Sequence, residues 1–293
     1  MKSLILSSEE SQMQAEKLAR YIGLEHKTID VRYFPDGESL VTLPLPLNEH
    51  LIVYFNLHNP NAKLIELILA CSTARRKGAQ RITLITPYLA YMRQDIENHP
   101  GEAISQQIIG EMLCNYIDDI ITVDPHLHRI ENLSQAYPLK NAISLSAEGI
   151  IGDYIKETYT DVLLLGPDGE SQQWVSAAAE RAGCSYGVAT KVRQGDRSVV
   201  ITLPEMALDN KKIVLVDDMI STGGTIIKIA SMLKDRHSTI EAAIVTHCLC
   251  THEDEQKILD SGVRKIISTE SIPHSTNVIS LTHLIGNAVK KII

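Results

Sequence analysis

The sequence predicts an α/β protein with two similar domains, each a mostly parallel sheet flanked by helices. Strand-like apolar runs alternate with helix-like segments along the chain, an order typical of parallel sheets covered by helices. This alternation restarts once, so the domains are expected at residues 1–145 and 146–293. The length of 293 residues is long for one such domain and suits two.

The first round of alternation shows clear helix ends. The helix expected over 12–21 is amphipathic and stops at Gly23, and the one expected over 62–76 has a basic last turn before Gly78. Glycine is favoured just after a helix, and basic residues are favoured at its carboxyl end. The expected strands of this round are 4–6, 51–55, 82–86 and 120–123, and the expected helices are 12–21, 62–76 and 103–116.

The second round continues to the carboxyl terminus. A helix over 171–182 is stopped by Gly183, and a polar turn is expected at 191–197 between two strands. The last helix, 284–291, is expected to pack back on the first domain. The expected strands of this round are 162–165, 186–189, 199–203, 213–216, 242–246, 265–268 and 278–281, with a further helix at 226–233.

Composition and charge exclude several classes of protein. With 28 basic and 36 acidic residues the net charge is −8, and nucleic-acid-binding proteins normally present a basic face instead. The five cysteines lack zinc-site spacing, and Cys248 and Cys250 are expected to be packing residues. No stretch approaches eighteen apolar residues and no export signal is recognisable, so we expect a cytoplasmic protein without a membrane partner.

The most informative segment is 213–225, which reads IVLVDDMISTGGT. A buried strand is followed by Asp217 and Asp218, by a loop rich in Ser, Thr and Gly, and by the start of a helix. Backbone N–H groups at such a helix start bind phosphate, and the two carboxylates accept hydrogen bonds from sugar hydroxyls. The segment predicts a site for a phosphorylated sugar. On these residues alone, an ordinary strand-to-helix turn with two solvated aspartates stays open as the alternative.

Six further motifs accompany this segment in a fixed order. Segment 213–225 resembles the phosphoribosyl-diphosphate binding motif of type I phosphoribosyltransferase folds. The whole set resembles the ribose-phosphate pyrophosphokinase family, in its shorter archaeal-type form, over residues 34–273 at least. The other motifs are FPDGE at 34–38, PYLAYMRQD at 87–95, VDPH at 123–126, GPD at 166–168, KVR at 191–193 and SIP at 271–273.

The resemblance implies a fold and an activity. Each domain is expected to have the type I phosphoribosyltransferase fold. The β,γ-diphosphoryl group of Mg-ATP is expected to pass to the 1-hydroxyl of ribose 5-phosphate, giving phosphoribosyl diphosphate (PRPP) and AMP for nucleotide biosynthesis. Lys191 is implied as the catalytic cation, with Arg193 as a catalytic contact to the sugar phosphate or the transition state. Spacing alone places both in a solvated basic turn.

The resemblance also implies binding residues for the two substrates. Those for ATP include a segment, 34–38, that in this family reaches the adenine from a neighbouring subunit, so a homodimer or a higher assembly is expected. The residues implied for ATP are Phe34, Asp36, Gly37, Glu38, Arg93 and Gln94. The residues implied for ribose 5-phosphate or PRPP are Arg193, Asp217, Asp218, Ser221, Thr222, Gly223, Gly224 and Thr225.

A magnesium site is implied in the same way. His126 and Asp168 are the implied contacts of Mg²⁺, with Asp124 as a weaker candidate. Aspartate suits a hard cation, whereas histidine is unusual for Mg²⁺ and has ATP phosphates as an alternative partner. The simpler reading is a hydrogen-bonded histidine and a turn aspartate.

Two other functions stay open on the sequence. A non-catalytic relative would bind nucleotide or sugar phosphate and regulate an active partner, but it would need neither Lys191 nor Arg193 for chemistry. A phosphoribosyltransferase that consumes PRPP would explain segment 213–225 but not the motifs of the first half.

Overall fold

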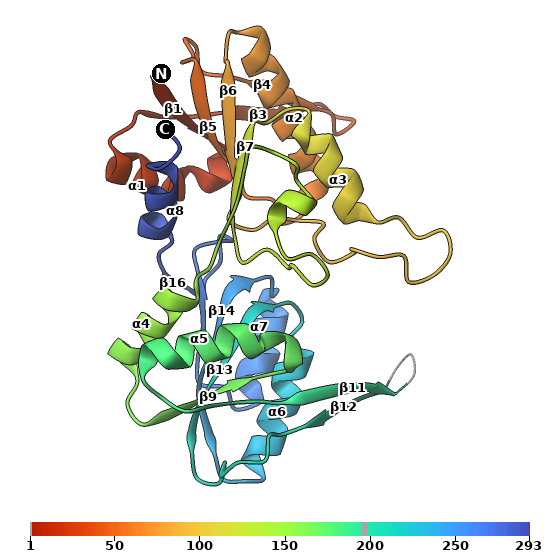
Figure 1. Cartoon of the computed structure of the whole chain (residues 1–293), viewed down its shortest axis with the longest axis vertical. Coiled ribbons are helices and arrows are strands. Elements are labelled where there is room, and N and C mark those ends of the chain that lie inside the picture. Colours follow the sequence, from red (N-terminus) through yellow and green to blue (C-terminus); the bar gives the residue numbers. More distant parts are fainter. Residues whose placement is uncertain (1, 195–197) are drawn as a thin grey trace. The chain divides into compact units, whose positions relative to one another are not determined.

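The computed structural model describes residues 2–194 and 198–293, and the side chains of 191–200 lie outside the described part. The chain divides into two compact units (Figure 1). The first unit comprises Met1–Leu145, Ser271–Pro273 and Leu281–Ile293, and the second comprises Ser146–Glu270 and His274–Ser280. The last helix therefore belongs to the first unit.

A six-stranded parallel sheet forms the centre of the first unit, in the order β2–β1–β5–β6–β7–β8. Every residue of β1, β5 and β7 is buried, as expected for parallel strands covered by helices on both faces. The strands are β1 (Ser3–Ser7), β2 (His26–Thr28), β5 (His50–Tyr54), β6 (Arg81–Ile85), β7 (Asp119–Val123) and β8 (Asn141–Leu145).

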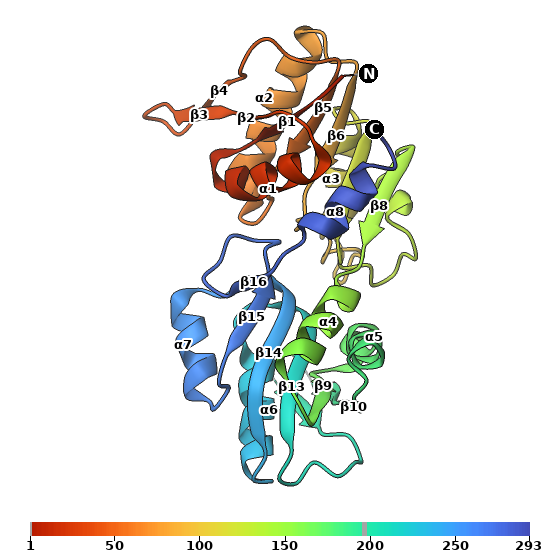
Figure 2. The same ribbon diagram turned by 90° about the vertical axis from the view of Figure 1, so that its left-hand side faces the viewer.

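Helices cover both faces of this sheet (Figure 1). Helices α2 and α3 lie on one face, and α1 lies beside α8 on the other (Figure 2). The hydroxyl of Tyr21 donates to Asn287 Oδ1 at 2.8 Å, and Lys290 Nζ lies 4.0 Å from the centre of the Tyr21 ring, so these contacts attach α8 to α1. The helices are α1 (Gln12–Ile22), α2 (Pro60–Arg76), α3 (Ser105–Cys114) and α8 (Thr282–Val289).

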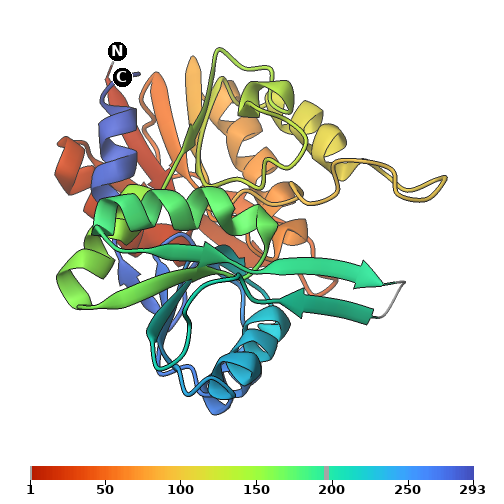
Figure 3. The same ribbon diagram turned by 60° about the horizontal axis from the view of Figure 1, so that its bottom comes forward.

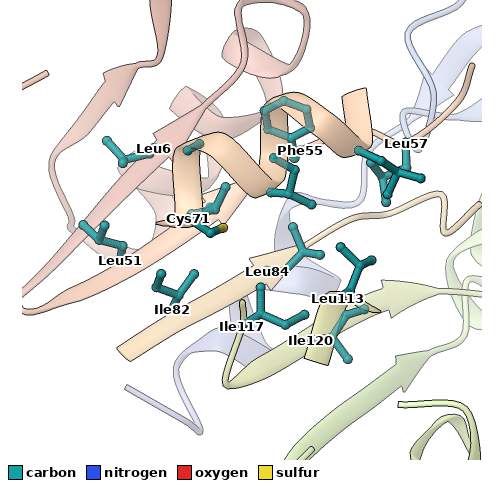
Figure 4. Close-up of a cluster of buried hydrophobic side chains, with 14 of the residues drawn as sticks. Leu6, Leu51, Phe55, Leu57, Cys71, Ile82, Leu84, Leu113, Ile117 and Ile120 are labelled. Atoms are coloured by element: carbon teal, nitrogen blue, oxygen red, sulfur yellow. The ribbon is translucent and has the colours of Figure 1, made fainter. Parts of the chain in front are cut away.

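Aliphatic side chains fill the space between α2, α3 and the sheet (Figure 4). Cys71 belongs to α2, Ile82 and Leu84 to alternate positions of β6, and Leu113 to α3, and all four are fully buried. Burial of each aliphatic side chain of this kind contributes roughly 1.5–3 kcal/mol. This packing holds in place the strand ends from which the loops of the candidate site begin.

The second unit repeats the arrangement with the strand order β10–β9–β13–β14–β15–β16, again parallel. Helix α4 packs on α5 over one face, and α6 packs on α7 over the other (Figure 2). The strands are β9 (Val162–Gly166), β10 (Tyr186–Val188), β13 (Lys212–Ile220), β14 (Thr239–Cys248), β15 (Ile266–Thr269) and β16 (Asn277–Ile279). The helices are α4 (Glu148–Thr158), α5 (Gln172–Ala182), α6 (Gly224–Lys234) and α7 (His252–Asp260).

Each unit also carries an antiparallel hairpin at the same place in its element order. In the first unit, β3 (Asp30–Tyr33) and β4 (Ser39–Thr42) follow β2, and in the second, β11 (Thr190–Gln194) and β12 (Ser198–Thr202) follow β10. The second hairpin extends away from its sheet (Figure 3). The predicted class, two similar domains with mostly parallel sheets flanked by helices, is confirmed.

Two local predictions were wrong. The polar turn expected at 191–197 begins too early, because Lys191–Gln194 belong to β11 and pair with β12, while residues 195–197 lie outside the described part. The strand expected at 213–216 continues as β13 through Asp217 and Asp218 to Ile220. Pairing with β14 continues as far as Ile220, and these backbone hydrogen bonds outweigh the low strand propensity of aspartate.

Several short or polar elements were not predicted, among them β2, β3, β4, β8, α4 and α7. Helix α7 buries only Ile258, so it lacks the apolar periodicity from which a helix is predicted. Its start is defined by a capping box of Thr251 and Asp254. None of the helices in the described ranges has the length and apolar character of a membrane span.

Candidate functional site

Three aspartates gather at the carboxyl end of the second unit's sheet. Asp217 and Asp218 lie near the end of β13, and Asp168 follows the neighbouring strand β9. The pairing of β9 with β13 ends at Leu215, so the aspartates lie on the part of β13 that extends past β9. In open parallel sheets, ligands bind beyond the carboxyl ends of the strands.

These carboxylates concentrate negative charge. Burial raises the pKa of Asp217 well above its ordinary value, and the charges of Asp218 and Asp168 raise it further. Asp218 is only 6% exposed, and Asp168 Oδ1 accepts the N–H of Glu170 at 3.1 Å. The reading of Asp217 and Asp218 as solvated turn residues is therefore wrong. Carboxylates this close together are suited to a bound cation or to the hydroxyls of a sugar.

The chain passes from β13 into α6 through the loop 221–225, whose last two residues, Gly224 and Thr225, already form the first turn of α6. Gly223 caps α6 with a φ of +73°, a left-handed conformation that other residues rarely adopt. A Cβ atom here would also lie 2.4 Å from the side chain of Ile258, so the position requires glycine. Ser221 and Thr222 are exposed, and the first N–H groups of any helix lack intrahelical acceptors. The loop is therefore suited to bind a phosphate.

The predicted catalytic cations lie on the hairpin of the second unit. In β11, Lys191 pairs with Ile201 and Arg193 pairs with Val199 across the ribbon. Positions two apart on a strand share one face, so the backbone places both residues on the same face of the hairpin. Their side chains lie outside the described part of the chain.

In the first unit, two loops at the carboxyl end of the sheet hold further candidates. Arg93 and Gln94 lie in the loop after β6, and His126 lies in the loop after the adjacent strand β7. Arg93 is exposed, and Gln94 Nε2 donates to the carbonyl oxygen of Ile96 at 2.8 Å. The ring of His126 lies parallel to that of His128, with centroids 5.8 Å apart.

Asp124 begins the second of these loops. It is 6% exposed, and its N–H donates to the carbonyl oxygen of Leu145 at 2.8 Å. Its φ of +39° is unusual for a residue other than glycine, and it turns the chain at the end of β7. These backbone features give Asp124 a structural role at the end of β7.

The FPDGE motif forms the tip of the β3–β4 hairpin. The N–H of Phe34 donates to Glu38 and the N–H of Gly37 donates to Phe34, each to the carbonyl oxygen at 2.9 Å. Asp36 Oδ1 accepts the N–H of Glu38 at 3.2 Å. The Phe34 residue is 50% exposed, so it does not anchor the turn in the core and presents an aromatic surface at the tip.

The predicted site residues thus fall into separate groups within each unit. Within the described ranges, no three His, Cys, Asp or Glu side chains are placed to hold a metal by themselves, so an ion here would share its coordination with substrate or water.

Sequence reasoning missed Asp95, which pairs with Arg129, because the two lie in different loops. Cys248 and Cys250 are buried, as predicted.

The comparisons with known proteins agree with this geometry. Residues 3–116 match the family model described as the N-terminal domain of ribose phosphate pyrophosphokinase. Residues 137–284 match the model described as the phosphoribosyl transferase domain.

Curated relatives match along nearly the whole chain. A ribose-phosphate pyrophosphokinase from Methanopyrus kandleri is 30% identical over 292 residues, which cover 99% of each chain. One from Thermoplasma acidophilum is 33% identical over 259 residues, or 88% of each chain. The crystal structure of phosphoribosylpyrophosphate synthetase from Mycobacterium smegmatis aligns with a TM-score of 0.86 at 22% identity, covering 100% of this chain and 99% of that one, and it supports the fold.

Proposed function

The chain belongs to the ribose-phosphate pyrophosphokinase family, and we propose that it transfers the β,γ-diphosphoryl group of ATP to the 1-hydroxyl of ribose 5-phosphate. The products are PRPP and AMP. The observation that carries this proposal is the pairing of a glycine-capped helix start with Asp217 and Asp218, which suits a phosphate and sugar hydroxyls in one ligand.

Ribose 5-phosphate binds to the second unit in this proposal. The 5-phosphate accepts hydrogen bonds from the N–H groups and hydroxyls of the loop 221–225. Asp217 and Asp218 accept hydrogen bonds from the ribose hydroxyls, and Arg193 adds positive charge near the phosphate. The exposure of Ser221 and Thr222 supports this assignment, because a ligand can reach both hydroxyls.

ATP binds to the first unit through the loops after β6 and β7. Arg93 and Gln94 contact the triphosphate and the adenine, and the hairpin tip 34–38 contacts the adenine of a neighbouring copy of the chain. The exposed aromatic surface of Phe34 supports this role, because a solvent-facing ring can stack on a base. A site shared in this way makes the protein a homodimer or a higher closed assembly.

The residues of the site fit a divalent cation, which we propose to be Mg²⁺. Burial first, and then the charges of Asp218 and Asp168, raise the pKa of Asp217, and a cation would offset that charge. In the second unit, Asp168 would offer the ion a hard carboxylate oxygen. In the first unit, His126 and, as the weaker candidate, Asp124 would offer contacts. When bound, the ion neutralises charge on the polyphosphate.

The reaction depends on positioning and charge neutralisation rather than on a covalent intermediate. The 1-hydroxyl oxygen bonds to the β-phosphorus, the bond from that phosphorus to the oxygen of AMP breaks, and the hydroxyl proton is released. Two like charges about 4 Å apart repel by roughly 4 kcal/mol at an effective dielectric of about 20. Lys191 and Arg193, both on β11, offset part of this repulsion in the transition state.

The test is to incubate the purified protein with Mg-ATP and ribose 5-phosphate and to follow AMP and PRPP. We expect both products in equal amounts, and a fall in kcat on the order of 100-fold or more for Lys191→Ala, with ribose 5-phosphate binding retained. Lys156→Ala, on α4 of the same unit, is the matched control and should leave kcat unchanged.

The other outcomes identify the competing functions. Binding of ribose 5-phosphate or ATP without turnover would indicate a regulatory relative. Consumption of PRPP with a nucleobase, and no formation of PRPP from ATP, would indicate a phosphoribosyltransferase. An unchanged kcat for Lys191→Ala would remove Lys191 from the catalytic machinery.

A further inference from the structure

Asp95 is a buried carboxylate in a largely exposed loop. Its side chain is only 4% exposed, although its neighbours Arg93 and Glu97 are exposed. A charged group buried in this way is costly unless it is paired and hydrogen-bonded. The partners of Asp95 therefore show what the loop after β6 is attached to.

Those partners come from the loop after β7. Arg129 Nη1 lies 2.6 Å from Asp95 Oδ1, and His128 Nδ1 lies 3.9 Å from Oδ2. Oδ2 is buried, and no donor among the described residues hydrogen-bonds to it. The carboxylate thus joins two loops that begin on neighbouring parallel strands, β6 and β7.

The joined loops carry the proposed ATP contacts. Asp95 follows Arg93 and Gln94 directly, and the ring of His128 lies parallel to that of His126, at 5.8 Å and 12°. Arg93 and Gln94 therefore lie next to Asp95 along the chain, and His126 lies beside His128, the nearer histidine of the other loop.

The backbone of both loops adopts unusual conformations. Tyr91, in the loop after β6, has a φ of +62°, and Asp124, at the start of the loop after β7, has a φ of +39°. Residues other than glycine hold such conformations only where surrounding contacts fix them, and such residues cluster at functional sites. The contact between Asp95 and Arg129 is one that fixes both loops.

We infer that Asp95, with Arg129, is a positioning residue that holds Arg93, Gln94 and His126 in one arrangement for the triphosphate of ATP. The inference rests on the proposed function of these loops. The Asp95 carboxylate is buried and so is costly unless it is paired, and its pairing with the half-exposed Arg129 fixes which residue of the other loop it lies against. Loss of the carboxylate lets the two loops move independently, which weakens ATP binding and leaves the sugar-phosphate loop of the second unit untouched.

The test compares KM for Mg-ATP with KM for ribose 5-phosphate in Asp95→Asn and Arg129→Ala. We expect each variant to raise KM for Mg-ATP on the order of tenfold, while KM for ribose 5-phosphate changes less than twofold. Arg129→Lys, which keeps the charge, should raise KM for Mg-ATP less than Arg129→Ala does. The double variant should be no worse than either single variant, because both remove the same interaction.

A second ion pair of the same unit supplies the control. Arg75 pairs with Asp118, the residue before β7, so this pair lies at the amino end of the strand, and the two joined loops begin at the carboxyl ends. Arg75→Ala should therefore leave both KM values unchanged. An equal rise in both KM values, no change in either KM value, or additive effects in the double variant would overturn the inference. Arg129 is 44% exposed, so its variants test the inference even where Asp95→Asn does not fold.

The dissociation constant of Mg-ATP separates this inference from the proposed function. A wild-type protein that makes no AMP and PRPP would contradict the proposed function, and the inference would then be judged on ATP binding alone. Weaker Mg-ATP binding by both Asp95→Asn and Arg129→Ala would still support it, and unchanged binding would overturn it.

Discussion

Asp217 lowers the stability of the ligand-free protein. Its carboxyl is buried beside Asp218 and near the charge of Asp168, and these surroundings raise its pKa. A carboxyl whose pKa is raised on folding stabilises the fold below its unfolded pKa of about 3.9, and that contribution is lost as pH rises through the folded value. Above the folded pKa the protein therefore holds an unfavourable charge, which a sugar hydroxyl or a cation would relieve.

Asp217→Asn should consequently stabilise the ligand-free protein and impair its reaction. We expect the free energy of unfolding at pH 7 to rise by about 1 kcal/mol, with most of the gain gone near pH 4, where the wild-type carboxyl is protonated in the folded state and about half protonated in the unfolded state. KM for ribose 5-phosphate should increase in the same variant. Thermal unfolding across pH 4–8 checks the first expectation, and a destabilised variant at pH 7 would show that Asp217 is satisfied without a ligand.

At the scale of elements, a polar network crosses the strands of the first sheet near their amino ends. The His50 ring bonds to Ser3 Oγ and to Thr83 Oγ1, both at 3.0 Å, and Thr83 Oγ1 donates to Asp119 Oδ2 at 2.9 Å. Arg81 Nε donates to the same oxygen at 2.7 Å. The network connects β1, β5, β6 and β7.

This network gives the first unit an acid-dependent stability. Burial alone would raise the pKa of Asp119, but hydrogen bonds from Arg81, Asn141 and Thr83 outweigh it and lower that pKa. The stabilisation is present above the unfolded pKa of about 3.9 and is lost as pH falls through the folded value. Asp119→Asn should cost about 2 kcal/mol at pH 7 and flatten the loss of stability below pH 4. Denaturant unfolding at several pH values checks this expectation. If the stability of the variant falls below pH 4 as steeply as that of the wild type, Asp119 is excluded as the cause.

Long apolar strands and amphipathic helices could be predicted from the sequence because their periodicity is local. The place of Asp217, Asp218 and residues 221–225 at the junction of a strand and a helix could be predicted for the same reason, since they lie within nine residues of one another. Helix α7 could not, because one buried residue, Ile258, leaves no periodic pattern. The pairing of Asp95 with Arg129 could not either, because a contact between loops 34 residues apart depends on the packing of the two strands that carry them.

The whole molecule repeats one architecture with different residues at equivalent loops. The segments SEESQ at 8–12 and DGESQ at 168–172 follow equivalent strands, β1 and β9. The equivalent of the phosphate loop lies between β5 and α2, where Asn59 caps the helix and Pro60 follows without a backbone N–H donor. The helix start of the first unit therefore offers one N–H donor fewer than that of the second, which supports the assignment of the sugar phosphate to the second unit.

The central claim is that the β- and γ-phosphates leave ATP together and join carbon 1 of ribose 5-phosphate through oxygen. Incubation with ATP labelled in its β-phosphate tests this most directly. The proposed reaction places all transferred label in PRPP, with one unlabelled AMP formed for each PRPP. Label recovered in ADP, or ATP left intact by folded protein in the presence of Mg²⁺ and ribose 5-phosphate, would contradict the claim.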